Sequence, residues 1–325
     1  MTLFYADRPT FPYGQLYMDV LDDILDTLDL KGALYFRTDF SAPWSVEVPD
    51  HAGAARFHLV VQGRLHVEVA GGGTAELNPG DLILVPRGRS HILSDSAGRK
   101  PLSYESLMRE SGYDGRGVIV YGKGDPEAAT QMICGHFNFR TGADHPLLRA
   151  LPGHIVVTAA KRAREPLLDD MLRMVARRLF AEGAGSVAAV TRLSEIVFIE
   201  LLRVGIRESG SFCSVLDAFS DRQIGRALEL VHSRPGENWT VEKLASEVAM
   251  SRSRFAERFS ELIGAGPMAY LADWRLQKAL AKLETSRESV QKIAGDIGYR
   301  SPAAFTRAFA QKFGQTPLEY RKMAS

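Results

Sequence analysis

The sequence contains an internal repeat in its last ninety residues, and this repeat constrains the fold more than any other feature. Six residues recur at a constant offset of 50, which pairs Ser251, Phe255, Phe259, Gly264, Pro267 and Tyr270 with Ser301, Phe305, Phe309, Gly314, Pro317 and Tyr320. Upstream of each serine the offset is 49, which pairs Ala245, Val248 and Ala249 with Ala294, Ile297 and Gly298. A duplication whose extra residue falls in a turn predicts two helix-turn-helix modules.

The helix after each serine is expected to be the one that contacts DNA. A recognition helix presents its N-terminal turns to base edges in the major groove. Helical spacing directs the phenylalanines of the first copy inward, and the outward positions carry three arginines. The guanidinium group matches both guanine edges and phosphates. We therefore predict that base sequence is read mainly by Arg252, Ser253, Arg254 and Arg258.

The second copy has a different outward surface. Pro302 and Ala303 stand where the first copy has Arg252 and Ser253, so direct base reading there is expected to be poor. The remaining polar residues are better suited to phosphates, which position a protein on DNA without specifying sequence. The predicted contacts of this module are Arg300, Ser301, Thr306 and Arg307, of which Ser301 also caps the helix.

Charge and composition fit an intracellular DNA-binding protein. Residues 221–325 carry 17 basic against 12 acidic side chains, whereas the whole chain has a net charge of only +1. The first residues lack a basic region followed by an apolar run, so no signal peptide is expected, and no apolar run is long enough to span a membrane. Two cysteines, Cys134 and Cys213, are too few for a disulfide framework. We expect a soluble cytoplasmic protein.

The N-terminal half is expected to form an antiparallel β-barrel or sandwich. A short amphipathic helix, Met18–Leu30, comes first. Short β-branched or alternating segments then follow, separated by glycine and proline turns. The predicted strands are Ala33–Phe36, Phe57–Val61, Leu65–Val69, Leu82–Val85, His91–Leu93, Val118–Tyr121 and Gln131–Phe139.

Two long helices follow the strands. The apolar spacing predicts Glu165–Glu182 and Val187–Arg207, broken at Gly183–Gly185. The apolar face of this hairpin either packs on the barrel or forms a dimer interface. Ser209–Ser220 is interpreted as a linker. The predicted domains are a sensor at 1–155, a hairpin and linker at 156–215, and a DNA-binding domain at 216–325.

A small-molecule or metal site is predicted inside the barrel. Seven of the eight histidines lie before residue 221, and the candidate site residues on predicted strands are His58, His91, Cys134 and His136. Two imidazoles and a thiolate can bind zinc or another transition metal. A polar pocket for an organic ligand, or buried structural histidines, are the alternatives.

Two resemblances add a family to this interpretation. Gly298-Tyr299, Ser301, Phe305, Arg307, Phe309, Gly314, Pro317 and Tyr320-Arg321 resemble the signature of the AraC/XylS family of bacterial transcription regulators, across residues 221–321. Gly80–His91 resembles the second cupin motif, and Phe57–Gly63 resembles the end of the first. Metal-binding cupins usually have a glutamate where this chain has Arg56.

The resemblances imply an α+β protein with a cupin-like N-terminal barrel, a helical hairpin and an all-α C-terminal domain with two helix-turn-helix modules. Such a protein is expected to bind double-stranded DNA as a homodimer, to respond to a small-molecule effector as an activator or repressor, and to contact RNA polymerase. It is not expected to be an enzyme. The alternatives are a cupin metalloenzyme, such as a dioxygenase, fused to a DNA-binding domain, and a DNA-binding protein whose barrel serves only for dimerisation.

Overall fold

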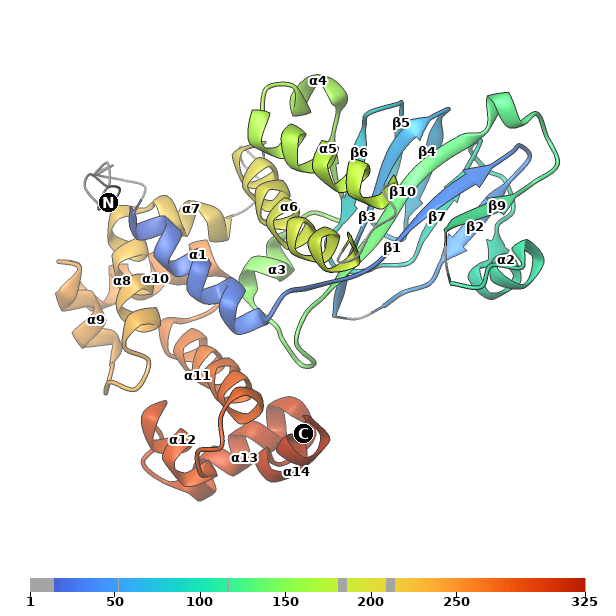
Figure 1. Ribbon diagram of the computed structural model, residues 1–325. Helices are drawn as coiled ribbons and strands as arrows, with labels where there is room; N and C mark the ends of the chain where they lie inside the picture. Colours follow the sequence, from blue (N-terminus) through green and yellow to red (C-terminus); the bar gives the residue numbers. More distant parts are fainter. Residues whose placement is uncertain (1–14, 52, 116, 181–185, 209–213, 325) are drawn as a thin grey trace, which may run out of the picture. The chain divides into compact units, whose positions relative to one another are not determined.

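The computed structural model describes residues 15–51, 53–115, 117–180, 186–208 and 214–324, and its elements belong to two compact units, one rich in strands and one made of helices (Figure 1). One unit holds all the strands, within residues 30–141 and 148–208. The other unit joins residues 15–29 and 142–147 to the helices of residues 214–324. The predicted α+β class, with sheet before helix along the chain, is confirmed.

The strands form two sheets. The six-stranded sheet has the order β11-β6-β3-β10-β1-β9, with bounds Ile155–Val157, Leu82–Val85, Ala54–Gln62, Thr130–Asn138, Lys31–Phe40 and Val118–Tyr121. The five-stranded sheet has the order β5-β4-β7-β2-β8, with bounds Gly73–Leu77, Leu65–Val69, His91–Ser94, Ser45–Val48 and Leu102–Ser103. Neighbouring strands pair antiparallel, as predicted, except that β9 runs parallel to β1 and β8 parallel to β2.

The core of the sheet-rich unit is built from alternate residues of both sheets. Val46 and Val67 of one sheet and Val60 and Met132 of the other belong to one buried apolar cluster. Burial of every second residue in β4 shows the alternation of a half-buried strand. The short segments between glycine and proline turns are therefore strands, as the sequence indicated. Strands β2, β5, β8 and β11 were not predicted.

A helical hairpin packs on the six-stranded sheet of this unit. The hairpin consists of α5 (Pro166–Phe180) and α6 (Ser186–Glu208), and its predicted turn at Gly183–Gly185 lies outside the described residues. Phe198 of α6 is fully buried, with its ring centroid 4.9 Å from that of Phe137 in β10. At least part of the apolar face of the hairpin thus packs on the six-stranded sheet. Shorter helices are α2 (Tyr104–Ser111), η1 (Pro126–Ala128), α3 (Pro146–Ala150) and α4 (Ala159–Arg162).

The helical unit contains α1 and α7–α14, with bounds Gln15–Leu28, Ser214–Ser220, Arg222–Ser233, Val241–Glu247, Arg252–Ile263, Pro267–Thr285, Val290–Asp296, Pro302–Phe313 and Pro317–Ala324. The interpretation of Ser209–Ser220 as a linker is wrong for its second half, which is helix α7; residues 209–213 lie outside the described residues. Among the described residues, no helix combines the length and the apolar character needed to cross a membrane.

A chain of buried and partly buried hydrogen bonds joins four segments of the helical unit. Asp23 of α1 bonds His232 Nδ1 of α8 at 2.9 Å, and His232 Nε2 lies 2.7 Å from the Tyr270 hydroxyl of α11. The same hydroxyl lies 3.0 Å from His145 Nε2, which comes from the segment before α3. Burial lowers the pKa of His232, although Asp23 opposes this effect. Helix α1 and residues 142–147 are therefore structural parts of the helical unit.

Candidate functional site

The two helix-turn-helix modules have the same turn. In the first, the peptide N–H of Met250 donates to the Ala245 oxygen at 2.9 Å, and in the second Tyr299 donates to Ala294 at 2.8 Å. The residues at the turn itself, Ala249 and Gly298, have φ values of 54° and 87°. These pairs keep the offset of 49, so the extra residue of the second module comes after the turn and before the recognition helix. The repeat in the sequence therefore corresponds to two modules with the same turn structure.

Both recognition helices, α10 and α13, are capped in the same way. The Ser251 hydroxyl accepts from the Arg254 peptide N–H, and the Ser301 hydroxyl accepts from that of Ala304, at 3.4 and 3.3 Å. Each helix ends at a glycine in the left-handed conformation, where residues with a Cβ are strained. The hydroxyl of Ser301, one of the predicted DNA contacts, is therefore used to cap α13.

The arginines of α10 differ in their freedom to contact a ligand. Arg254 is exposed and its side chain has no ion pair or hydrogen bond to any described residue. Arg252 is also exposed, and its Nε lies 2.7 Å from Glu242 Oε1. Arg258 is held more firmly, with its Nε 3.2 Å from Asp221 Oδ2 and its Nη1 2.9 Å from Glu261. Of the predicted base-reading arginines, Arg254 is thus the one that is free to turn toward DNA.

On α13 and the turn before it, the polar groups are spaced more widely. Arg300 and Arg307 are exposed, and neither side chain has a hydrogen bond or ion pair within the described part of the chain. The Thr306 hydroxyl donates to the Pro302 oxygen at 2.9 Å, which satisfies it locally. The exposed surface of the first turn consists of Pro302 and Ala303, as the sequence indicated.

Helix α11 sets the separation between the modules. It runs from Pro267 to Thr285, between α10 of the first module and α12 of the second (Figure 1). Its 19 residues correspond to about 28 Å at the rise of an α-helix. Successive turns of the major groove are roughly 34 Å apart. Tyr270 of α11 packs on Phe259 of α10, with ring centroids 5.7 Å apart, and Leu280 belongs to the apolar core of the second module. The spacing is therefore fixed by a helix packed on both modules.

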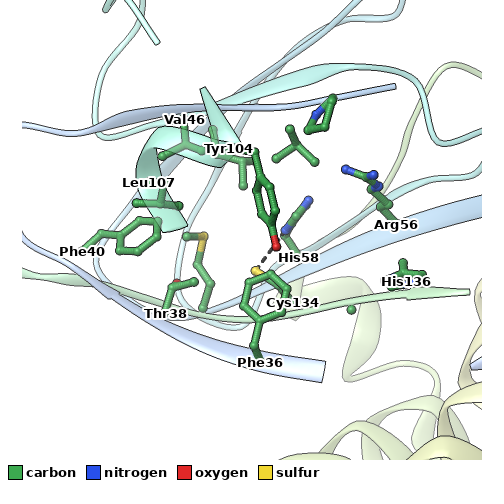
Figure 2. Close-up of a pocket in the computed structure, with 15 residues that line it drawn as sticks. Phe36, Thr38, Phe40, Val46, Arg56, His58, Tyr104, Leu107, Cys134 and His136 are labelled. Atoms are coloured by element: carbon green, nitrogen blue, oxygen red, sulfur yellow. Dashed lines mark hydrogen bonds between the residues drawn. The ribbon is translucent and has the colours of Figure 1, made fainter. Parts of the chain in front are cut away.

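The second candidate site is a cavity of about 160 Å³ inside the sheet-rich unit (Figure 2). Its lining comes from both sheets and from α2, and is mostly apolar. The polar lining residues are Thr38, Arg56, His58, Tyr104, Cys134 and His136. Three of the four residues predicted for an effector or metal site, namely His58, Cys134 and His136, line this cavity. His91 does not line it but is hydrogen-bonded to His58.

Strand register explains why these side chains meet. In the pairing of β3 with β10, His58 is opposite Cys134, and Arg56 is opposite His136. His58 Nδ1 lies 3.1 Å from Cys134 Sγ, and its Nε2 lies 2.9 Å from Nε2 of His91, which comes from the facing sheet. His91 Nδ1 lies 2.8 Å from the backbone oxygen of Arg89. Four groups therefore form one hydrogen-bonded chain.

The backbone oxygen of Arg89, at one end of this chain, fixes which group donates in each hydrogen bond. A backbone oxygen can only accept, so His91 Nδ1 carries the proton and its Nε2 accepts from His58 Nε2–H. His58 Nδ1 then accepts from the Cys134 thiol. All groups are neutral in this arrangement, which agrees with burial: burial lowers the pKa of His91 to about 4 and that of His58 well below its usual value, and it raises the pKa of the Cys134 thiol.

The geometry does not fit the predicted metal site. A metal bound by His58, His91 and Cys134 needs one atom of each to point at a common centre. Here His91 and Cys134 lie at opposite nitrogens of the His58 ring, so the three cannot converge in this arrangement. His136 lines the cavity, and its ring lies beside that of His51, with 6.4 Å between the ring centroids. Among the described residues, no three His, Cys, Asp or Glu side chains are grouped as metal ligands.

Three polar lining residues, Thr38, Arg56 and Tyr104, were not predicted for this site. Arg56 is two residues before His58 and so shares its face of the strand, a signal that was available from the alternation alone. Tyr104 begins α2, and nothing in the sequence around it indicated that it would reach the cavity. In Figure 2, Tyr104 lies beside His58 and Cys134, and Arg56 lies on the side of His136.

Comparison with known proteins gives the following matches. Residues 19–206 match the Cupin family, and residues 244–323 match a helix-turn-helix domain family. The HTH-type transcriptional regulator AlkR of Acinetobacter baylyi is 31% identical over 311 residues, covering 94% of this chain and 100% of AlkR. MtrA of Neisseria gonorrhoeae, also named an HTH-type transcriptional regulator, is 26% identical over 94% of this chain and 98% of its own. The solved DNA-binding domain of AdpA in complex with a target DNA is 35% identical, covers 32% of this chain and 92% of its own, and has a TM-score of 0.31.

Proposed function

Because the chain belongs to the AraC-type family of DNA-binding transcription regulators and carries a cupin domain, we propose that its two modules bind successive major grooves of one duplex. We also propose that a small molecule in the cupin cavity modulates this binding. The observation that carries the first part is the repeated turn and cap geometry, together with exposed arginines on both recognition helices. Such a regulator acts on DNA in the bacterial cytoplasm.

In this proposal the first module contacts bases and the second contacts phosphates. Arg254, helped by Ser253 and Arg252, reads base edges, because it lies in the first turn of α10 and its guanidinium has no partner among the described residues. Arg300 and Arg307 contact phosphates, since the first turn of α13 offers only Pro302 and Ala303 to the bases. Thr306 and Ser301 border the same surface. Arg258 can contact DNA only if its ion pairs with Asp221 and Glu261 break.

Binding measurements on two variants test this division. Duplexes selected by the full-length protein from a random library would be titrated at several salt concentrations. Arg254→Ala should weaken binding by about 1–3 kcal/mol at selected base pairs and relax the sequence preference there. Arg307→Ala should weaken binding to all sequences alike and reduce the salt slope by about 1. The same change of base preference in both variants would contradict the division.

Dimerisation through the hairpin is proposed on the basis of exposed apolar side chains. Leu167 and Met174 of α5 are seven residues apart, on one helix face, and are 54% and 43% exposed; Ile196 of α6 is 42% exposed. An apolar face of this kind is typical of an interaction surface. Sedimentation of Met174→Glu should show a monomer at concentrations at which the unaltered protein is a dimer, and an unchanged dimer would exclude this face. RNA polymerase is a further proposed partner.

The cavity is proposed to bind a molecule and not to transform it. Its polar core is a neutral chain of His58, His91 and Cys134 whose hydrogen-bonding groups already satisfy one another. A buried thiol with a raised pKa is a poor nucleophile. Gel shifts with and without candidate metabolites test the modulation. If molecules that bind in the cavity leave the affinity for DNA unchanged, the modulation is excluded and the barrel has only a structural role.

A further inference from the structure

One positive charge faces the cavity. Among the fifteen residues that line it, Arg56 is the one that is charged at neutral pH, and none is acidic. Burial lowers the pKa values of His58 and His136 and raises those of Tyr104 and Cys134, so these four are neutral. The cavity therefore has a net charge of +1.

The Arg56 guanidinium has no fixed partner. It is partly buried, and burial lowers its pKa, although an arginine remains charged in proteins. Within the described residues its side chain makes no hydrogen bond or ion pair; the carboxylate of Asp50 and the Tyr104 hydroxyl act on it only at longer range. A partly desolvated cation without a partner is unfavourable. An anion in the cavity would remove this penalty.

The other end of the cavity is apolar and small. Figure 2 shows Phe40 and Leu107 at the end away from Arg56 and His136. The volume of about 160 Å³ is close to that of an engineered cavity of about 150 Å³ that binds benzene. An apolar body of about one six-membered ring therefore fits, and a long chain does not.

A buried hydroxyl supplies an independent indication of a ligand. Thr38 is only 4% exposed, and its Oγ1 has no hydrogen-bond partner in the described part of the chain. It stands between Phe36 and Phe40 in β1, so alternation places all three on the face that lines the cavity. Buried hydroxyls normally have a partner. A ligand can supply it.

We propose that the cavity binds a small organic monocarboxylate, with its carboxylate at Arg56 and an apolar body of about one ring between Phe40 and Leu107. A polar substituent on that ring can bond the Thr38 hydroxyl. The inference rests on the proposed role of the cavity as the effector site, and it names the chemical class of the effector.

Calorimetric titration of the full-length protein tests this class with a matched pair of probes, cyclohexanecarboxylate and its neutral amide. The carboxylate should bind at least roughly tenfold more tightly than the amide, as expected of a hydrogen bond to a charged group. Arg56→Gln should abolish this preference. Arg64→Gln, which changes an exposed arginine outside the cavity, should preserve it. Equal affinity for both probes, binding of neither, or a preference that survives in Arg56→Gln would overturn the proposal.

Gel shifts with the same probes separate this proposal from the proposed modulation. If cyclohexanecarboxylate binds through Arg56 but leaves the affinity for DNA unchanged, the ligand class stands and the modulation by ligand fails. If the amide alters DNA binding and the carboxylate does not, modulation stands and the ligand class is wrong.

Discussion

Acidification from pH 7.5 to 5.0 should destabilise the sheet-rich unit, because its buried histidines are neutral. The pKa of His91 is lowered to about 4 in the folded protein, against roughly 6.5 in an unfolded chain. Between these pH values the unfolded state binds more protons than the folded state. The contribution of neutral His91 to the free energy of unfolding is therefore fully present above about pH 6.5 and is lost as the pH falls. At pH 5.0 the loss from His91 alone is 1.5 pH units at 1.36 kcal/mol each, or about 2 kcal/mol. The lowered pKa of His58 adds a loss of the same sign.

Urea unfolding at a series of pH values measures this loss. Trp44 is a suitable probe, since it is buried and packs edge to face on Phe40 at 5.0 Å. Replacing Trp239 and Trp274 by phenylalanine leaves Trp44 as the single tryptophan, and both replaced residues belong to the helical unit.

The variant His91→Gln isolates the contribution. Glutamine has an acceptor oxygen and an NH2 group that donates, so it can keep the bonds to His58 and to the Arg89 oxygen. The loss of stability between pH 7.5 and 5.0 should shrink by about 2 kcal/mol. The control His66→Gln, on β4 and outside the hydrogen-bonded chain, should leave this loss of stability as it is in the unaltered protein. A pH dependence that is the same in His91→Gln as in the unaltered protein would refute the neutral chain.

Two further predictions concern stability. Tyr270→Phe removes the hydroxyl that joins the buried histidines of the helical unit, and it should lower the free energy of unfolding of that unit by about 1–3 kcal/mol in urea titrations. Gly122→Ala should unfold or strongly destabilise the sheet-rich unit, by more than about 3 kcal/mol, because the new Cβ overlaps the backbone oxygen of Ser41. Gly112→Ala, at a positive φ of 63° with open space around it, should cost only about 1–2 kcal/mol. Equal effects of the two glycine variants in thermal unfolding would show that the overlap is relieved at no cost.

The helix-turn-helix modules could be predicted in detail because their signal is local. The phenylalanine spacing and the serine caps are set within a dozen residues, and the change of offset from 50 to 49 marked the turn that Ala249 and Gly298 occupy. The ion pair of Arg258 with Asp221 could not be predicted, because it joins residues 37 positions apart. It depends on how α8 packs beside α10.

The cavity was only partly predictable for the same reason. Alternation placed Cys134 and His136 on one face of β10, and both line the cavity. The meeting of His58 with Cys134 depends on the register between β3 and β10, and its meeting with His91 depends on two sheets facing each other. Arg56 was not predicted to line the cavity, because the residue was interpreted only as a replacement in a metal-binding motif.

The assignment of α1 and of residues 142–147 to the helical unit could not be predicted from the sequence either. Asp23 and His145 lie within the predicted sensor region of residues 1–155, yet both contact helices of the unit that carries the two modules. An amphipathic helix such as α1 shows which of its faces is buried but not against which partner. Its acidic residues are not all solvated, since Asp23 also pairs with Lys278 Nζ at 2.6 Å.

The central claim, that both modules bind one duplex, is tested most directly by footprinting the full-length protein on a selected duplex. Cleavage by hydroxyl radicals should show two protected patches on one face of the DNA, about ten base pairs apart. Arg307→Ala should weaken the patch at the second module first. A single patch that does not change in Arg307→Ala would contradict the account, because α13 would then not contact the DNA.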